Sequence, residues 1–356
     1  MRRAGGDRPP RADRDSGDAG RGLRLTAGLT LHPALVFVAG LVIVLAGAEM
    51  VLRGASRVAV RLRVPPILIG LTVVSVGTSV PELAVGITAV AEDKGPLAVG
   101  NIAGTNILNI LFILGLSALM RPLPTRMLSV RLDVPVMIAA ALALIAMAWD
   151  GRLDRSEGVV LLIGAVLYTA ALVRLSREES AAMQREFARE VADVMPATLR
   201  SARLFMAWNS ALLLAGMALT LFGADLLVNG ASSIARTYGV SDAFIGLTIV
   251  AIGTSAPELA TTVLSTLKND RDVAIGNLIG SSIYNILVIL GLTMTIAPHG
   301  IEVGSDVLRI DLPLAALVAI VCLPVFRSER RVSRTEGGLF VSAYLIYLSL
   351  LLFVRH

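Results

Sequence analysis

GLTVVSVGTSVPELAV (70–85) returns later in the chain as GLTIVAIGTSAPELAT (246–261), and this repeated stretch decides the fold. Sixteen positions align without a gap, and eleven of them are identical. Each copy carries one glutamate, Glu82 or Glu258, in a stretch otherwise apolar enough to cross a membrane. A carboxylate in the hydrocarbon core is costly unless another group compensates it. A chain that does this at two matching positions is predicted to build a cation site from two halves.

The composition predicts an all-α membrane protein. The chain has 356 residues, of which 55% are hydrophobic and only 17% charged, with a mean hydropathy of +0.75. A soluble protein would carry roughly a quarter of charged residues. Apolar runs here reach the ~20 residues that span a bilayer. We predict ten spans, at about 34–52, 65–91, 97–120, 132–149, 158–174, 204–228, 243–265, 273–297, 307–326 and 338–354.

The charged residues and the cysteine exclude several other classes of function. The net charge of +5 does not indicate a nucleic-acid partner, because the basic residues lie in loops between spans and aromatic residues make up only 4%. The single cysteine, Cys322, lies in an apolar run, where we expect it to pack. The three histidines, His32, His299 and His356, form no ligand cluster. We expect no cofactor.

The distribution of positive charge predicts the orientation. Nineteen of the twenty-five Lys and Arg residues beyond the tail lie in the loops on one side, which include the polar linker 175–201. Positive loops face the cytoplasm, so the linker is predicted inside and both termini outside. The tail 1–30 holds seven arginines, but it also holds aspartates and many Gly and Pro residues. We therefore interpret it as a disordered tail. The expected location is the plasma (inner) membrane of a prokaryote.

The repeat extends well beyond the opening motif. Residues 47–115 align with 223–291 at a constant offset of 176. Five predicted crossings separate equivalent points, so the second copy must run in the opposite sense through the bilayer. This predicts two inverted five-helix halves, an architecture of many secondary transporters. Duplication kept only for packing would not explain why the matched positions are polar. The predicted units are 1–30, 31–174 with repeat 47–120, 175–201, and 202–356 with repeat 223–297.

Polar residues of both copies are the candidate site. Pro81 removes one helical hydrogen bond and clashes with the carbonyl four residues earlier, near Gly77. Irregular backbone at this depth is expected only where it lines a cavity. The spacing of Thr78, Ser79 and Glu82 keeps two hydroxyls and a carboxylate near one helix face. The second copy has the same arrangement in Thr254, Ser255 and Glu258.

The neighbouring spans add more oxygen atoms. Thr105 and Asn109 stand four residues apart in GTNILN, and Ser281 and Asn285 do the same in GSSIYN. The glycines of the same segments, Gly100, Gly104, Gly276 and Gly280, are spaced for close helix packing. All candidate ligands are oxygens, and two of them are carboxylates. Such a site suits one Ca²⁺, while Zn²⁺ or Cu would require His or Cys. Two Na⁺ would balance the charge equally well.

The motif G-T-S-x-P-E and its partner G-[ST]-[NS]-x-x-[ND], present in both halves, closely resemble the paired α-repeats of the Ca²⁺/cation antiporter superfamily, in its prokaryotic sodium/calcium exchanger branch. The resemblance is specific over 47–120 and 223–297 and architectural elsewhere. It implies a ten-helix fold with outward termini, and electrogenic exchange of Ca²⁺ for Na⁺ by alternating access. The first and sixth spans would slide over a fixed four-helix core.

The resemblance also assigns roles to residues. Glu82 and Glu258 would hold the central Ca²⁺, assisted by Thr78 and Thr254. Flanking Na⁺ positions would use Ser79, Ser255, Thr105 and Ser281, with Asn109 and Asn285 near the centre. Several exchangers have an aspartate where Asn285 stands, and potassium-dependent relatives use acidic residues at this kind of position. The neutral pair here argues against K⁺ co-transport. We expect the chain to work as a monomer.

Other functions remain as alternatives. A buried carboxylate can carry protons, so Ca²⁺/H⁺ exchange is the second hypothesis. An intramembrane hydrolase with the two glutamates as an acid/base pair is less favoured, because no nucleophile or metal cluster accompanies the pair. A passive cation channel also stays open as a less favoured alternative, since channels too use rings of carboxylates. Vesicle flux would separate the three classes. Glu49 and Asp225 occupy matched positions, where we expect pairing with arginines near the interface rather than a place along the ion path.

Overall fold

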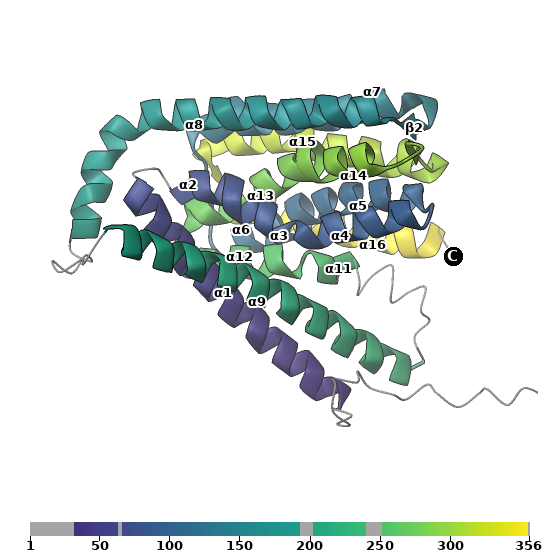
Figure 1. Cartoon of the computed structure of the whole chain (residues 1–356), viewed down its shortest axis with the longest axis horizontal. Helices are drawn as coiled ribbons and strands as arrows, with labels where there is room; N and C mark the ends of the chain where they lie inside the picture. The colour runs from purple at the N-terminus through teal and green to yellow at the C-terminus, as the bar shows by residue number, and fades with distance from the viewer. Residues whose placement is uncertain (1–31, 63–65, 193–201, 240–250, 355–356) are drawn as a thin grey trace, which may run out of the picture.

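The computed structural model describes residues 32–62, 66–192, 202–239 and 251–354, and these are almost entirely helical (Figure 1). Three expectations from the sequence lie outside the described residues. They concern the tail 1–30, the linker residues 193–201, and the part of the second motif before residue 251.

The first half of the chain contains helices that are interrupted by short turns of different pitch. These elements are α1 (Pro33–Leu62), α2 (Pro66–Ile69), η1 (Gly70–Val74), α3 (Ser75–Thr78), α4 (Val80–Ala91), α5 (Gly95–Ile107), η2 (Leu108–Leu114), α6 (Gly115–Met120), β1 (Leu123–Pro124), η3 (Ser129–Asp133), α7 (Val134–Met147), η4 (Ala148–Asp150), β2 (Arg152–Leu153) and α8 (Arg155–Ala192). α8 does not end with its apolar stretch and continues through most of the predicted linker.

The second half repeats this pattern. Its described elements are α9 (Ala202–Thr237), α11 (Ala251–Thr254), α12 (Ala256–Leu267), α13 (Arg271–Tyr284), η6 (Asn285–Leu290), α14 (Gly291–Ile296), β3 (Ile301–Glu302), η7 (Val307–Asp311), α15 (Leu312–Arg327), η8 (Ser328–Arg330), β4 (Arg331–Val332) and α16 (Arg334–Val354). Prolines stand in the first turn of α4, α5 and α12, the part of a helix that tolerates them, and near the start of α7 and α15, which continue directly from η3 and η7.

Eight helical stretches of the described residues are long and apolar enough to cross a membrane, namely Pro33–Ala59, Ile67–Ala91, Gly95–Met120, Ser129–Asp150, Arg155–Ser176, Leu204–Thr237, Arg271–Ile296 and Val307–Arg327. They coincide with eight of the ten predicted spans and confirm an all-helical membrane fold. Helices α12 and α16 lie at the two remaining positions. The number ten itself stays a prediction, because α12 follows residues outside the described part.

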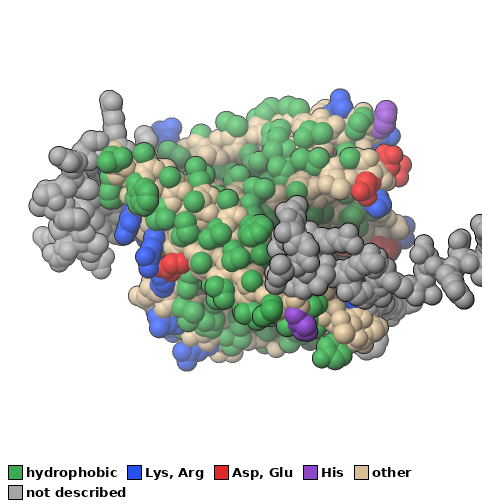
Figure 2. Space-filling model, turned by 60° about the horizontal axis from the view of Figure 1, so that its bottom comes forward, with side chains coloured by type: hydrophobic (Ala, Val, Ile, Leu, Met, Phe, Trp, Pro, Cys, Tyr) green, Lys and Arg blue, Asp and Glu red, His purple; other side chains and the backbone are tan. Residues whose placement is uncertain are grey.

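Two small sheets define the ends of the molecule. At one end β1 pairs antiparallel with β4, and at the other end β2 pairs antiparallel with β3. We call the end with β1, β4 and the α12–α13 turn the linker end, and the other the opposite end. Figure 2 shows Lys and Arg side chains gathered mainly at the linker end, on the left, and Asp and Glu mainly on the right. Each sheet joins two loops that the sequence places on one side of the membrane.

The helices differ in how deeply they lie in the protein. The stretch Arg271–Ile296 is 94% buried in its apolar window and Gly95–Met120 is 78% buried, against 28–39% for α1, α9 and the outer helices. These two stretches carry all four predicted site residues that lie outside the two motifs, namely Thr105, Asn109, Ser281 and Asn285. Polar side chains are tolerated at membrane depth when protein rather than lipid surrounds them, and these helices provide that surrounding.

Helices α1 and α9 cross the rest of the bundle as a separate antiparallel pair (Figure 1). Glycines at intervals of seven bring their backbones together: Gly40, Gly47 and Gly54 on α1, and Gly216, Gly223 and Gly230 on α9. A Cβ on Gly40 would lie 2.5 Å from Leu227 N, and one on Gly54 would lie 2.7 Å from Leu213 N. Small residues permit this approach of backbones within a membrane. The two glycine series are equivalent under the offset of 176, so the pair is symmetric.

Candidate cation-binding site

The helix breaks at both copies of the motif, where the sequence predicts a break. Ser79, with φ −85° and ψ 10°, separates α3 from α4. Ser255, with φ −91° and ψ 10°, separates α11 from α12 in the same way. Pro81 and Pro257 follow in the first turn of the second helix of each pair, so their missing N–H groups explain the interruption.

The break places each glutamate at the start of a new helix. Glu82 lies in the first turn of α4 and Glu258 in the first turn of α12. The unpaired N–H groups and the dipole at a helix N-terminus favour negative charge. Both side chains are fully buried. The hydroxyl of Ser79, three residues before Glu82, donates to Glu258 Oε1 at 3.3 Å. The two motifs, one from each half, therefore meet inside the protein.

Buried polar atoms without a hydrogen-bond partner gather among the predicted ligands. Of the described residues, such atoms include Glu82 Oε1 and Oε2, Glu258 Oε2, Asn109 Oδ1 and Nδ2, Asn285 Oδ1, and Ser255 Oγ. Native structures pair the great majority of buried polar atoms, so a concentration of exceptions needs an explanation. Six of these seven atoms are oxygens, the ligand atoms that Ca²⁺ and Na⁺ use.

Other predicted ligands are partly engaged with structural partners. Thr78 Oγ1 donates to Ser75 O and to Asn277 Oδ1, both at 3.3 Å, and Ser281 Oγ donates to Ser75 O at 3.5 Å. Their oxygens keep lone pairs that can face a cation. Thr105 is buried on α5, while Thr254 on α11 is half-buried.

Both asparagines lie in widened helical turns. Asn109 is the second residue of η2 and Asn285 is the first residue of η6, and both segments are π-helical. The two segments occupy equivalent positions in the halves. Such bulges are rare and frequently occur at functional sites. The sequence did not predict them, because no residue type in these stretches breaks an α-helix.

Two further asparagines, which the sequence analysis did not single out, form hydrogen bonds that orient the predicted ligands. Asn285 Nδ2 donates to Asn106 Oδ1 at 3.2 Å, and Asn106 Nδ2 donates to Ser282 O at 3.0 Å. This leaves the Asn285 carbonyl oxygen without a partner among the described residues. Asn277 accepts from Thr78 and donates to Thr261 Oγ1 at 2.9 Å. The signal was present, since Asn106 occupies a variable position of the partner motif and Asn277 follows a repeated glycine.

The predicted close packing of the motif glycines holds in the second half. A Cβ on Gly276 would lie 2.8 Å from Ile67 O, and one on Gly280 would lie 2.5 Å from Leu71 O. For Gly104 the prediction stays untested, because residue 247, the equivalent of the Leu71 that packs on Gly280, lies outside the described residues. Gly100 makes only an ordinary contact, 3.4 Å to Val307 Cγ2.

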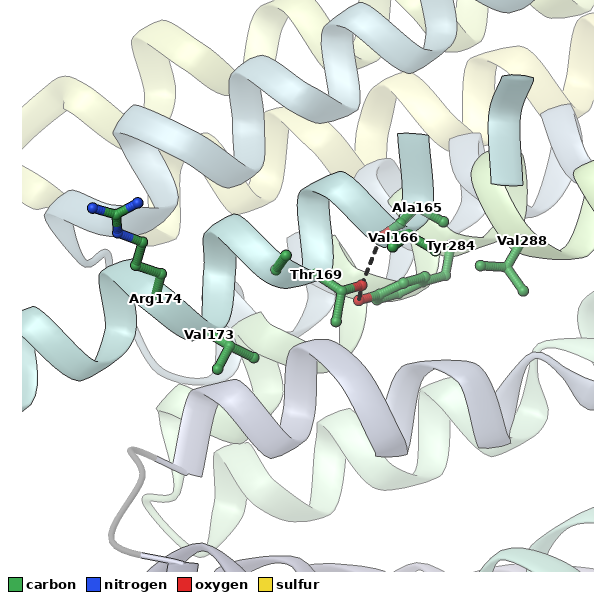
Figure 3. A pocket seen from close by; sticks show the side chains of 8 residues that line it. Ala165, Val166, Thr169, Val173, Arg174, Tyr284 and Val288 are labelled. Carbon is green, nitrogen blue, oxygen red and sulfur yellow. Dashed lines mark hydrogen bonds between the residues drawn. The ribbon is translucent and has the colours of Figure 1, made fainter. Parts of the chain in front are cut away.

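A groove on α8 lies apart from the two glutamates. It has a volume of about 870 Å³ and is formed by α8 together with Tyr284 and Val288. Figure 3 shows Thr169 and Tyr284 turned toward each other, with their hydroxyls 2.7 Å apart. The lining is mostly apolar, so this groove is no cation site. Among the described residues no group of three or more His, Cys, Asp or Glu could hold a metal, which leaves two carboxylates with neutral oxygens.

A family model described as sodium/calcium exchanger protein matches residues 32–174 and 208–353. The chain belongs to the sodium/calcium exchanger family. This exchanger is 36% identical over 323 residues to the antiporter named CaxA of Alkalimonas amylolytica, covering 89% of this chain and 98% of that protein. It is 27% identical to the sodium/calcium exchanger MaX1 of Methanosarcina acetivorans, covering 90% and 98%.

A solved structure supports the same assignment of the exchanger. The sodium-calcium exchanger NCX_Mj, soaked with Na⁺ and Sr²⁺, matches with a TM-score of 0.75 at 26% identity, covering 89% of this chain and 97% of that one. The predicted exchanger fold is thereby confirmed. The family makes this protein a cation antiporter of the membrane rather than an enzyme.

Proposed function

We propose that this exchanger moves Ca²⁺ against Na⁺ by alternating access, with the ions bound between the two GTSxPE motifs. One observation carries the proposal: three carboxylate oxygens of Glu82 and Glu258, with oxygens of Asn109, Asn285 and Ser255, are buried without hydrogen-bond partners in the described protein. Such oxygens are costly unless they bind something. The relatives named as sodium/calcium exchangers support the choice of ions.

The charge of the site explains the exchange. Two ionised carboxylates give −2, which one Ca²⁺ or two Na⁺ would neutralise. Without either, the buried charges repel each other and have lost their hydration, so the site favours exchange over release into an empty state. Ser79 holds Glu258 and Asn106 holds Asn285, so the oxygens are oriented before an ion arrives. No substrate other than these small cations is required.

We further propose that the linker end faces the cytoplasm and that both termini face outward. The excess of Lys and Arg in the linker-side loops supports this orientation. The protein is proposed to lie in the plasma membrane of a prokaryote and to work as a monomer, because the candidate ligands all come from one chain. Labelling of single cysteines from outside intact cells would test the orientation.

Reconstituted liposomes test the function. Loaded with Na⁺ and diluted into ⁴⁵Ca without Na⁺, they should accumulate calcium, and a sodium ionophore should abolish the accumulation. Collapse by a proton ionophore instead would establish Ca²⁺/H⁺ exchange and refute the choice of Na⁺. Equilibration without an opposing gradient would indicate a channel.

Variants connect this activity to the two acids. Glu82→Gln and Glu258→Gln keep side-chain size but remove one charge each, and either should reduce Na⁺-driven Ca²⁺ uptake to the level of empty liposomes. Glu302→Gln, which changes an exposed glutamate of β3, is the matched control and should transport normally. Normal exchange by either site variant would show that the site is misplaced.

A further inference from the structure

The turns at the two ends of the molecule have the same backbone. Asp93, between α4 and α5, has φ 56°, and its equivalent Asn269, between α12 and α13, has φ 66°. Lys94 N–H donates to Ala89 O at 2.7 Å, and Asp270 N–H donates to Ser265 O at 2.8 Å. Differences between the ends therefore come from side chains and neighbours, because the turns themselves are equivalent.

At the linker end, α1 is fastened to this turn. Lys268 Nζ forms an ion pair with Glu49, which also accepts from Arg53 Nε at 2.5 Å. Ser56 Oγ donates to Asp270 Oδ2 at 3.0 Å. These ion pairs agree with the expectation that Glu49 pairs with basic residues rather than lining the ion path. The contacts join the α1–α9 pair to the end of α12, the helix whose first turn holds Glu258.

Apolar packing also joins the α1–α9 pair to α12. Val44 and Ala48 of α1 form a buried cluster with Ala224 of α9 and with Ala256 and Ala260 of α12. Ala256 and Ala260 are each only 8% exposed. The face of α12 that leads from the linker end to Glu258 is therefore covered.

Within the described residues, the opposite end lacks the equivalents of these contacts. Val80, the equivalent of Ala256, is 43% exposed, and Ala84, the equivalent of Ala260, is exposed as well. Ser232 Oγ, the equivalent of Ser56 Oγ, is buried without a partner among the described residues. Asp225, the equivalent of Glu49, is exposed and pairs with no described basic residue, contrary to expectation. Within the described residues, the α1–α9 pair thus covers α12 at the linker end and leaves the matching face of α4 exposed at the opposite end.

The two turns also differ in residue type at equivalent positions, so the asymmetry would persist in a conformation closed at the opposite end. A conformation closed at the opposite end would bring Asp225 toward Glu92, because Glu92 is the equivalent of Lys268. Like charges would then stand where the linker end has an ion pair. Lys94, the other basic residue of that turn, is already bonded to Glu92 at 2.7 Å.

We infer that the Glu49–Lys268 ion pair is a latch, a contact that stabilises only the conformation closed at the linker end. At the opposite end Glu92 stands where a matching ion pair with Asp225 would need a basic residue, so the opposite conformation lacks this stabilisation. The inference rests on the proposed alternating access and deepens it. A contact made in one of two states shifts their populations by its own free energy. For a half-exposed ion pair this is a shift of about two- to fivefold.

Cysteine labelling measures this shift. Ala260→Cys places a thiol on the covered face of α12, so a charged maleimide reacts in proportion to the population that opens the linker end. In purified protein, Lys268→Gln should raise the labelling rate about two- to fivefold. Glu92→Lys should raise it too, because it supplies the missing latch with Asp225. Exchanging the charges, with Glu49→Lys and Lys268→Glu together, should restore the slow rate.

Matched controls separate the latch from damage to the fold. Glu302→Lys makes the same charge change at the same end outside the turn and should leave the rate unchanged. The native Cys322 is fully buried, so its own labelling in chains without Ala260→Cys reports unfolding. If Lys268→Gln exposes Cys322, the labelling rates of Glu92→Lys and of the charge exchange decide whether the latch exists.

Two results would overturn the inference. The first is an equal labelling rate for Ala260→Cys in the parent, Lys268→Gln and Glu92→Lys proteins. The second is an acceleration by Glu302→Lys equal to that by Glu92→Lys. Labelling needs no transport, so rate changes in a protein that fails to exchange Ca²⁺ for Na⁺ would support the latch and refute only the proposed ions.

Discussion

Replacing Gly47 by alanine should destabilise the protein by forcing α1 and α9 apart. The added Cβ would lie 2.6 Å from Thr220 N and 2.9 Å from Gly216 O, whereas ordinary contact begins at 3.4 Å. These two neighbours are backbone atoms, so rotating the Thr220 hydroxyl, which lies closer still, would not relieve the contacts. The equivalent position on α9, Gly223, is closed by Val44 N at 2.6 Å.

The magnitude follows from two opposing effects. Overpacking a tight interface typically costs ~1–3 kcal/mol. Alanine returns up to ~1 kcal/mol of helix propensity relative to glycine. The net loss is therefore about 1 kcal/mol for Gly47→Ala. Adding Gly223→Ala should cost less than twice as much, because one separation of the helices relieves both contacts.

Thermal unfolding in detergent, followed by tryptophan fluorescence, measures this. Trp208 lies on α9. A loss of this size should lower Tm by roughly 1–3 °C in a chain of this length. The control is Gly164→Ala on α8, where the Cβ would meet Leu287 Cδ2 at an ordinary 3.6 Å, so Tm should stay equal or rise. Gly47→Ala as stable as Gly164→Ala would refute the close approach of α1 and α9.

Further predictions concern the amide groups of the site. Asn106→Ala removes the acceptor that holds Asn285 and should raise the KM for Ca²⁺ about fivefold, the equivalent of a hydrogen bond worth ~1 kcal/mol, while largely sparing the maximal rate. Ser117→Ala, which truncates a buried hydroxyl without a partner in the described protein, should leave KM unchanged, and an equal effect of the two would refute the positioning role. Asn285→Asp adds a carboxylate at a position proposed as a ligand. It should raise Ca²⁺ affinity or make uptake sensitive to pH or K⁺, and indifference in Ca²⁺ titrations would remove this residue from the site.

The parts of the fold that follow from composition and from proline could be predicted. Long apolar stretches must satisfy their backbone groups internally, so the membrane helices follow from hydropathy. The break before each glutamate follows from Pro81 and Pro257, since proline acts locally whatever packs around it. The ends of the helices were harder to predict. α8 runs to Ala192, far beyond its apolar stretch, because charged residues with good helix propensity can extend a helix into water.

Features that depend on tertiary contacts were not predictable in the same way. The π-helical turns at Asn109 and Asn285 have no sequence signal, because no residue type in these stretches breaks an α-helix. Asn106 could be noticed in the motif, but its partner Ser282 O is a backbone atom of the other half. Only the folded chain shows which amide orients which ligand.

The proposed ion site uses residues that match between the two halves, whereas the proposed latch uses residues that differ between them. The proposed cation site draws on matching oxygens from both halves, and Glu82 and Glu258 are identical under the repeat. The turns at the ends have no such requirement, and there Glu92 stands at the counterpart of Lys268 with the opposite charge. If the halves were fully symmetric, the two conformations would be equal in energy. Departures from the repeat at the ends are therefore where a preferred resting state can be encoded without altering the ion site.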